Sequence, residues 1–424
     1  MKEIFLIYLW ENKLLKGPFA TTNGQQLEIL HPGSRNTNAG PDFLNARIRL
    51  DDTLWAGNVE IHLNASDFYK HNHHTDKAYD NLILHVVYAA DQEVYSASRQ
   101  SIPTLEVMGK FDESILLRYR SFIDSKHEIA CAGSLNTVQP FTVLAWLDRM
   151  MAGRLEKKTM RLQAMLEQTG NDWEEVAYRV FMSNFGFKVN ELPCEMLSAS
   201  LPFRLLLKHA DQLVQLEALL LGQAGLLGGP FTEAYPLKLQ KEFVFLAAKY
   251  HLKPLKPELW KFLRMRPANF PTIRLAQMAA LIHANGQVFS NILAVRNKSD
   301  LEAMFSVSAS SYWDTHFRFE HSSGNTKKRL GQEAINLLII NSVVQLLFAY
   351  GQVKSDVAFI DKALLLLEEM PPESNHITKL FGPLGIKATN ALQSQALLHL
   401  KNEYCKPKQC LDCHIGHVLI KSKG

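Results

Sequence analysis

The alternation of hydrophobic and polar residues is clearest in residues 43–50 and 54–64, where it has the period of two that is typical of β-strands. A short acidic turn separates the two segments, so the pattern predicts a β-hairpin. Pairing about that turn places Asp42 opposite Glu60 and His62. Because side chains alternate between the two faces of a strand, Glu60 and His62 share one polar face. We expect this face to hold a functional site.

The elements around the hairpin predict a small α/β domain over residues 1–110. The opposite face of the second strand is expected in the core and consists of Trp55, Gly57, Val59, Ile61 and Leu63. Helical spacing predicts helices over residues 2–16 and 66–80, and apolar runs predict short strands over residues 26–30, 81–89 and 104–108. The order is therefore helix, three strands, helix and strands.

The pattern changes to helical spacing after this domain. The expected helices cover residues 141–167, 173–185, 203–221, 237–250, 273–284, 299–305, 331–350, 356–369 and 394–404. Glycine, proline and asparagine residues separate them. We predict a large all-α domain over residues 111–400, followed by a separate tail over residues 401–424 that is rich in cysteine and histidine.

Length, charge and composition indicate the number of domains, the possible partners and the location of the protein. A chain of 424 residues is long enough for two or three domains, and a net charge of +4 permits a nucleic-acid partner without demanding one. The N-terminus has no pattern of a signal peptide. The strongest apolar segment, Ala334–Ala349, is interrupted by three amide side chains, so we expect no membrane span. These features predict a cytoplasmic protein.

Two carboxylates that face one point, as predicted for Asp42 and Glu60, can hold a hard divalent cation such as Mg²⁺ or Mn²⁺. Such a cation can bind both an attacking water and a phosphate oxygen, which suits hydrolysis of a phosphodiester bond. The first 110 residues, with Pro41-Asp42 on one strand and Glu60-x-His62 on the next, resemble the PD-(D/E)XK nuclease superfamily.

This resemblance implies a restriction-endonuclease-like domain, a mixed sheet flanked by helices, with Asp42 and Glu60 as metal ligands. It also implies that Glu11, on the first predicted helix, is the additional acid found in many members. His62 stands where the superfamily has lysine. A neutral imidazole can act as a base or a ligand but carries no permanent charge. Two functions therefore stay open: an active nuclease, and an inactive nuclease fold that binds nucleic acid or acts as a scaffold.

A histidine-rich segment, with His71, His73, His74 and Asp76, follows the hairpin. His71 and His74 are three residues apart, so a helix would place them on the same side, where they could bind a metal or a phosphate. The alternatives are an exposed polar face or a hydrolase of another kind that uses the histidines. His85, in an apolar strand, is expected to be a hydrogen-bonded core residue.

The tail has the most specific spacing. Cys410 and Cys413 form a Cys-x2-Cys pair, and Cys405 offers a third thiolate. A fourth ligand from His417 or His414 would complete a zinc site, whereas Cys131 would give a four-cysteine site for zinc or an iron–sulfur cluster. The second arrangement resembles the iron-stapled nucleases of the same superfamily. Free thiols in a basic tail are the other interpretation.

Arginines and aromatic residues are interleaved in residues 260–274. Arg264, Arg266 and Arg274 could pair with phosphates while the neighbouring rings stack on bases, which predicts a nucleic-acid partner, with DNA favoured over RNA. The alternative is that the arginines hold a proline-rich turn.

The whole chain also resembles a family of uncharacterised bacterial proteins of about this length. The stretches that carry this resemblance are residues 31–33, 40–43, 57–62 and 266–274 and the tail cysteines. The resemblance extends over the whole chain but implies no mechanism.

Overall fold

The computed structural model describes residues 1–422 and divides the chain into two compact units. The first, which we call the sheet unit, comprises residues 1–143 and the tail from Lys401 onward. The second, the helical unit, comprises residues 144–400. The predicted order of a mixed α/β domain and a helical body is confirmed. The tail, however, is part of the sheet unit, because it packs with the segment that follows residue 110.

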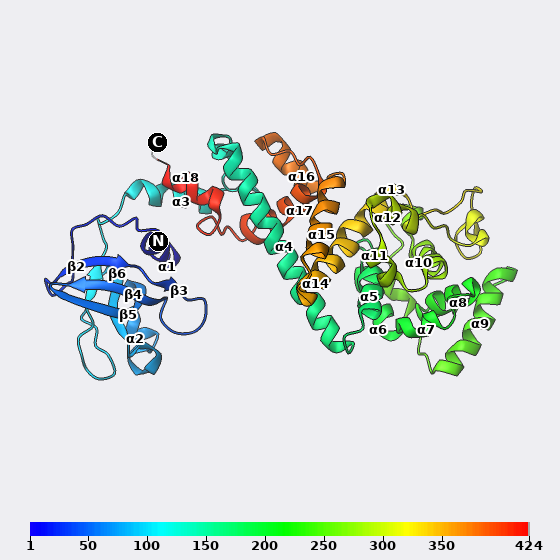
Figure 1. Cartoon of the computed structure of the whole chain (residues 1–424), viewed down its shortest axis with the longest axis horizontal. Helices are drawn as coiled ribbons and strands as arrows, with labels where there is room; N and C mark the ends of the chain where they lie inside the picture. Colours follow the sequence, from blue (N-terminus) through cyan, green and yellow to red (C-terminus); the bar gives the residue numbers. More distant parts are fainter. Residues whose placement is uncertain (423–424) are drawn as a thin grey trace. The chain divides into compact units, whose positions relative to one another are not determined.

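A mixed sheet of seven strands forms the centre of the sheet unit (Figure 1). The strands are β1 (Phe19–Ala20), β2 (Gln26–His31), β3 (Ser34–Arg35), β4 (Phe43–Leu50), β5 (Thr53–Asn64), β6 (Leu82–Ala89) and β7 (Thr104–Glu106). Their spatial order is β1-β2-β4-β5-β6-β7, with β3 also paired to β4. The pairs from β1 to β5 are antiparallel, whereas β6 runs parallel to both β5 and β7. The sheet is therefore mixed, as predicted.

Strands β4 and β5 form the predicted hairpin. Leu50 pairs with Thr53 at the turn, and Phe43 pairs with Val59 near the far end. An irregularity before Ala46 shifts the register there. The prediction for Trp55 was wrong: Trp55 is 47% exposed, and its neighbours at the start of β5 are exposed as well.

Helix α1 (Glu3–Glu11) is shorter than predicted and is apolar around most of its circumference. Every residue from Phe5 to Trp10 is buried. A helix that is apolar on all sides belongs inside a core, so α1 is enclosed by the sheet and by neighbouring segments. Beyond Asn12 the chain extends, and Leu15 forms a β-bridge with Phe111.

The helix predicted over residues 66–80 is broken into three short pieces. Helix α2 covers only Asp67–Lys70, and the 3₁₀ turns η1 (His73–Thr75) and η2 (Lys77–Tyr79) follow. The break occurs at Asn72, which has the left-handed backbone conformation with φ of 63°. Asparagine tolerates this conformation better than most residues, so it is a favourable place for the helix to end.

The rest of the sheet unit joins the residues after β7 to the tail. These elements are α3 (Glu113–Asp124), η3 (Ala132–Thr137), η9 (Leu400–Cys405) and α18 (His414–Lys421). Helices α3 and α18 lie side by side (Figure 1). Nε of Arg118 in α3 donates a hydrogen bond of 2.8 Å to the carbonyl oxygen of Ile420 in α18. The tail is therefore tied to the sheet unit by its backbone as well as by its side chains.

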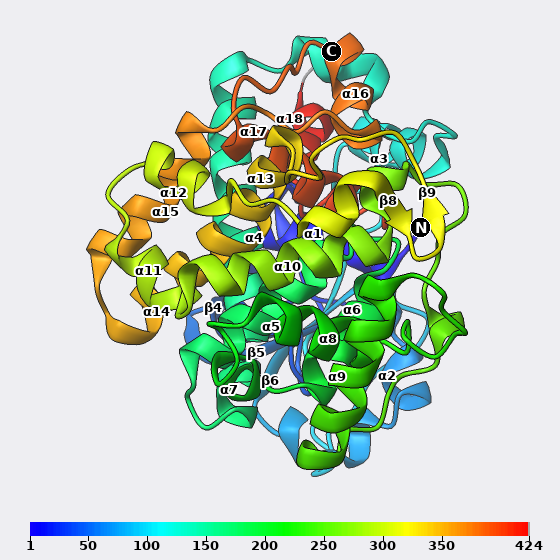
Figure 2. The ribbon, with the colours of Figure 1, turned by 90° about the vertical axis from the view of Figure 1, so that its right-hand side faces the viewer.

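The helical unit contains most of α4 (Pro140–Gln168), a two-stranded sheet and thirteen further α-helices within the described residues. The helices are α5 (Trp173–Phe185), α6 (Glu191–Ser200), α7 (Phe203–Leu207), α8 (Leu213–Gln223), α9 (Ala234–Tyr250), α10 (Pro271–Asn285), α11 (Val288–Ala294), α12 (Lys298–Phe305), α13 (Gln332–Leu338), α14 (Val344–Lys354), α15 (Val357–Glu369), α16 (His376–Phe381) and α17 (Ala391–His399), and the strands are β8 (His316–Arg318) and β9 (His321–Ser322). Helix α10, most of which is buried, runs beside α5 and α8 (Figure 2). It is the central helix of this unit.

One helical segment, Gln332–Lys354, is long and apolar enough to cross a membrane by length and composition. In the structure, 72% of its most apolar stretch is buried within the protein. Burial of this extent is typical of a core helix.

Candidate functional site

The hairpin register brings Asp42 and Glu60 together at the edge of β4. The backbone N–H of Asp42 donates a hydrogen bond of 3.0 Å to Oε2 of Glu60, and the N–H of Ile61 donates one of 3.0 Å to Oδ2 of Asp42. Each carboxylate is thus fixed by the backbone of the other strand. The predicted opposition of Asp42 and Glu60 follows directly from this pairing.

Gly57 allows β5 and β6 to approach closely just before Glu60. A Cβ atom at Gly57 would lie 2.5 Å from Cγ2 of Ile83 and 2.7 Å from the carbonyl oxygen of Asn81. Real Cβ atoms do not approach neighbours so closely. The glycine therefore helps to set the position of β5 from which Glu60 and His62 project.

Burial makes the carboxylates of this region difficult to ionise. Burial is the largest cause that raises the pKa of Asp42 to about 6, while the charge of Arg35 opposes the increase. The pKa of Glu60 rises to about 9, first because of burial and then because of the negative charge of Asp42. Glu3 in α1 has its pKa raised to about 7 by burial and by Asp42. Three acidic groups therefore share one poorly solvated region, where a cation would favour their charged forms.

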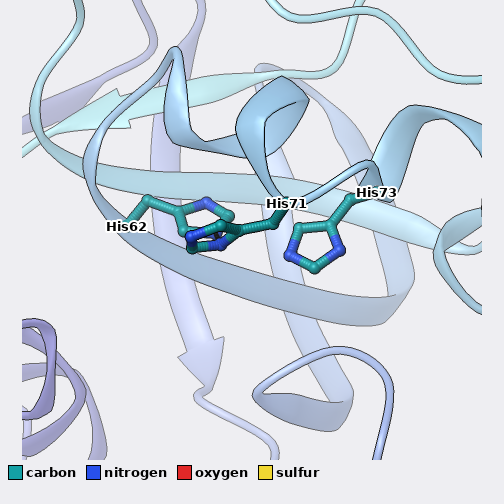
Figure 3. A group of neighbouring side chains, drawn as sticks. All are labelled: His62, His71 and His73. Carbon is teal, nitrogen blue, oxygen red and sulfur yellow. Dashed lines mark hydrogen bonds between the residues drawn. The ribbon is translucent and has the colours of Figure 1, made fainter.

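Three imidazoles gather beside Glu60. One ring nitrogen each from His62, His71 and His73 lies within 4.8 Å of the others (Figure 3). His62 comes from β5, His71 directly follows α2, and His73 begins η1. The left-handed conformation at Asn72 turns the chain between the latter two, so that both approach His62.

Glu60 faces the same point as these histidines. Its Oε1 atom lies 3.2 Å from Nε2 of His73 and 3.5 Å from Nε2 of His62. Nε2 of His62 also lies 3.2 Å from Nδ1 of His71. Three imidazole nitrogens thus lie together, with a carboxylate oxygen of Glu60 beside two of them, and these are suitable donors for a divalent transition metal ion.

A fourth histidine, His85, orients the side chain of His62. Nδ1 of His62 lies 2.8 Å from Nε2 of His85, whose side chain on β6 is fully buried. When His62 donates from Nδ1 to His85, its Nε2 presents a lone pair to His71, His73 and Glu60. Hydrogen bonds of this kind commonly fix the tautomer and orientation of a metal-binding histidine. The prediction of His85 as a hydrogen-bonded core residue is confirmed.

His62 is held in its neutral form. Burial and the neighbouring imidazoles, first His85 and then His73 and His71, lower the pKa of His62 to about 3. Neutral imidazole is the form that binds metals. The side chain is therefore suited to the role of a ligand and cannot supply the positive charge that lysine would have at this position.

The site is open to solvent on one side. The side chain of His62 is only 1% exposed, whereas His71 is exposed and His73 is partly so. The ring of Tyr79 stacks on His73, with 4.0 Å between the ring centres. Solvent and a substrate would therefore approach from the side of His71, while Tyr79 limits the movement of His73.

The histidine nitrogens change which metal ion we expect this site to prefer. Two carboxylates alone would favour Mg²⁺ or Mn²⁺, as the sequence predicts. The imidazoles that join Glu60 favour Mn²⁺, Zn²⁺ or Fe²⁺ over Mg²⁺, because nitrogen ligands suit transition metals.

The predicted helix acid occupies a different position from the one expected. Glu11 lies at the end of α1, with Oε2 3.6 Å from NH1 of Arg35. Arg35 also forms an ion pair of 2.9 Å with Asp412. Glu3, two turns earlier in α1, is the acid whose charge acts on Glu60. Glu3 was not predicted, because the resemblance pointed to Glu11, at the other end of the same helix.

His74 was predicted to share a side with His71, but it does not join the group. Its ring packs on Tyr69, with 5.1 Å between the ring centres. His73 lies beside His71, where His74 was predicted to lie. The reason is that helix α2 ends at Lys70, before both residues. The asparagine between His71 and His73 was the available signal for that break.

The arginines of residues 260–274 have different environments. Arg264 and Arg266 are exposed and stay candidates for contact with nucleic acid. Arg274 is only 7% exposed, lies over the ring of Phe187, and donates a hydrogen bond of 2.8 Å to Oε1 of Gln277. A nucleic-acid role for Arg274 is therefore wrong, because burial and these partners occupy its guanidinium group.

The tail residues are divided between two neighbourhoods. His417 contacts α1, with its Nδ1 3.1 Å from the hydroxyl of Tyr8. Cys405, Cys410 and Cys413 belong to the same unit as Cys131, where Lys401 and Lys408 donate hydrogen bonds to the backbone that precedes Cys131. Cys131 and His417 both stay candidates for the fourth ligand.

Comparison with known proteins places the chain in a family. Searches of curated proteins and of solved structures gave no match. A family model matches residues 3–376, which include the hairpin, the histidine group and most of the helical unit. The resemblance to an uncharacterised family is thereby confirmed, and the chain belongs to the family described as a protein of unknown function, DUF2851.

Proposed function

We propose that the protein is a metal-dependent hydrolase that cleaves phosphodiester bonds in nucleic acid. The observation that carries this proposal is the convergence of Glu60 with His62, His71 and His73, directly beside the buried carboxylate of Asp42. We propose Mn²⁺ as the catalytic ion because it suits the carboxylates, whereas Zn²⁺ and Fe²⁺ suit the imidazoles and would bind such a site more tightly.

Each residue has a distinct task in this proposal. Glu60 and the three histidines hold the ion, and Asp42 supplies a second carboxylate on the neighbouring strand. When bound, a divalent ion polarises a phosphate oxygen and lowers the pKa of water. His85 orients His62, and the hydrogen bonds between β4 and β5 fix both carboxylates in advance.

The arrangement of elements agrees with a restriction-endonuclease-like domain. An N-terminal helix, a mixed sheet and two carboxylates on adjacent strands occur in the order that the PD-(D/E)XK resemblance implies. We therefore extend the proposal to this fold identity and to a cytoplasmic location, where nucleic acid is accessible.

A nucleic-acid substrate also suits the basic surfaces of the chain. The helical unit contains a cleft lined in part by Arg204, Lys208 and Lys253. Arg264 and Arg266 add exposed positive charge in the same unit. Lysine and arginine bind phosphates without regard to base sequence, so these residues would contribute affinity. DNA is our first choice of substrate and RNA the second.

A second candidate function is binding of nucleic acid without cleavage. The observation that favours it is the neutral, buried state of His62, because no positive charge stands where nucleases of this type have lysine. In that case the metal would have a structural role and the fold would serve as a binding module or scaffold.

Cleavage assays with the purified full-length chain distinguish these functions. Single- and double-stranded DNA and RNA are incubated with Mn²⁺, Mg²⁺ or Zn²⁺, with wild type and with Asp42→Asn and Glu60→Gln. Asp52→Asn, an exposed turn residue of the same hairpin, is the control. We expect cleavage with Mn²⁺ by wild type and the control, and a loss of at least about 100-fold in both site variants.

If wild type and both site variants are inactive on every substrate, the proposed hydrolase function is wrong. Salt-sensitive binding of nucleic acid in that same experiment would then support the second candidate.

A further inference from the structure

Four of the five cysteines belong to the sheet unit and come from two distant segments. Cys131 directly precedes η3, whereas Cys405 ends η9 and Cys410 and Cys413 lie before α18. The structure records no disulfide between cysteines of the described residues. More than 270 residues of sequence separate Cys131 from the other three, so only the fold brings them together.

Two tail lysines hold the Cys131 segment against the tail. Nζ of Lys401 donates a hydrogen bond to the carbonyl oxygen of Glu128 and lies 3.2 Å from its Oε2 atom. Nζ of Lys408 donates to the carbonyl oxygens of Ile123 and, at 2.9 Å, Ser125. Both lysines thus bind the backbone immediately before Cys131. The contact is built from specific hydrogen bonds and not from apolar packing alone.

The chain between the tail cysteines is tightly folded. A Cβ atom at Gly416 would lie 2.1 Å from the carbonyl oxygen of Cys410, so only glycine permits this approach of α18. The N–H of His417 donates a hydrogen bond of 2.7 Å to the carbonyl oxygen of Cys413. Cys410 and Cys413 are only 8% and 7% exposed. The Cys-x2-Cys turn is therefore fixed by its own backbone and faces the protein interior.

The positions of the two segments are set by contacts that surround the cysteines. Lys401 and Lys408 hold the backbone before Cys131, and α18, which follows Cys413, packs beside η3, which follows Cys131. The pKa values agree with this packing. Burial, followed by Cys413 and Cys410, raises the pKa of Cys131 to about 12, and burial and Cys413 raise the pKa of Cys410 to about 11.

We propose that Cys131, Cys405, Cys410 and Cys413 form a metal centre with four thiolate ligands, which binds zinc or an iron–sulfur cluster and fastens the tail to the sheet unit. Sulfur ligands select these metals over Mg²⁺ and other hard cations. Each thiol loses its proton when it binds, and the positive charge of the metal replaces the protons that burial otherwise retains. A zinc ion and an iron–sulfur cluster would use the same four ligands, but they differ in colour and in the number of metal atoms per chain.

The proposed cysteine centre would also stabilise the surroundings of the proposed hydrolase site. Asp412, between two of the ligands, forms the 2.9 Å ion pair with Arg35. The charge of Arg35 lowers the pKa of Asp42, so the tail holds in place a cation that acts on the proposed site. The tail also reaches α1, which carries Glu3, through the contact of His417 with Tyr8. Binding at the cysteines therefore maintains one edge of the carboxylate region.

The test is metal analysis of the full-length chain purified without oxygen. We expect about one zinc, or up to about four irons with inorganic sulfide, per chain at the cysteines. Visible absorption that dithionite bleaches identifies the cluster, and colourless protein with zinc identifies the alternative. Cys131→Ser and Cys410→Ser should each lose this metal, whereas Cys194→Ser should retain it, because Cys194 is buried in the helical unit.

Wild-type protein gives a second readout that does not depend on the folding of variants. X-ray absorption at the metal edge should show sulfur ligands at about 2.3 Å. Nitrogen and oxygen ligands alone, or metal that all the cysteine variants retain, would overturn the proposal. The proposed hydrolase is tested separately, since Glu60→Gln should leave the cysteine-bound metal unchanged.

Discussion

At the scale of residues, two buried glutamates differ in a way that identifies the site. Glu217 is fully buried, but Nε1 of Trp313 and the hydroxyl of Tyr235 donate hydrogen bonds of 2.9 and 3.0 Å to it. These neutral donors indicate a structural role. Glu60 instead faces imidazole nitrogens and a second carboxylate. The two carboxylates repel one another and would be stabilised by a cation, so Glu60 is the stronger candidate for a ligand.

His85 provides a test of positioning that does not remove a ligand. Replacing His85 with Ala should weaken Mn²⁺ binding about 10- to 100-fold, because His62 loses the partner that sets its orientation. His85→Gln retains a hydrogen-bonding group and should recover part of the loss. Isothermal titration of Mn²⁺ measures both.

The control for this comparison is His74→Gln, since His74 lies in the same region but outside the histidine group. Equal affinity in wild type and His85→Ala would show that His85 only fills space. Circular dichroism before each titration would verify that the variants are folded.

The sequence predicted Asp42, Glu60 and His62 because strand alternation is local. Once the turn is placed, the period of two determines which side chains share a face. The sequence placed His73 in the histidine-rich segment but chose His74 as the partner of His71, because the end of the helix was not predicted. Glu3 was missed, because its position depends on how α1 packs. Those features are set by tertiary contacts that no local pattern contains.

At the scale of elements, the hairpin and the order of the sheet were predictable, whereas the segment after β5 was not. β4 and β5 form the expected hairpin and bring Asp42 to Glu60, although Leu50 pairs with Thr53 and an irregularity before Ala46 shifts the register. The apolar run of β6 lies in the sheet, as predicted. The segment from Ser66 to Asp80 has helix-compatible spacing, yet the left-handed Asn72 divides it. Tertiary contacts of the histidines outweigh a weak helical preference there.

A substitution at Gly57 tests whether the close approach of β5 and β6 requires glycine. Gly57→Ala should destabilise the sheet unit by about 1–3 kcal/mol, because its Cβ would meet Ile83 and the carbonyl of Asn81. Urea denaturation followed by tryptophan fluorescence gives the free energy of unfolding.

Gly133→Ala is the matched control for Gly57→Ala, since a Cβ at Gly133 would meet no atom within 4 Å. It should change the free energy of unfolding by less than about 0.5 kcal/mol. If both variants behave alike, the close approach of β5 and β6 is not what requires glycine at residue 57.

At the scale of the whole molecule, the chain combines a sheet unit that holds both candidate metal sites with a helical unit that holds the basic cleft. The sequence predicted this division but placed the boundary near residue 110 and separated the tail. The tail belongs to the sheet unit because Arg35 binds Asp412, and because Lys401 and Lys408 bind the segment before Cys131. Contacts between residues so distant in sequence are not visible in local patterns.

The most direct test of the central claim is a crystal structure of the protein soaked in Mn²⁺, with anomalous scattering recorded at the manganese edge. We expect one anomalous peak at about 2.0–2.3 Å from Glu60 and from the facing nitrogens of His62, His71 and His73. The peak should be absent in Glu60→Gln crystals prepared in the same way. A manganese peak elsewhere, with none at these four side chains, would contradict the account.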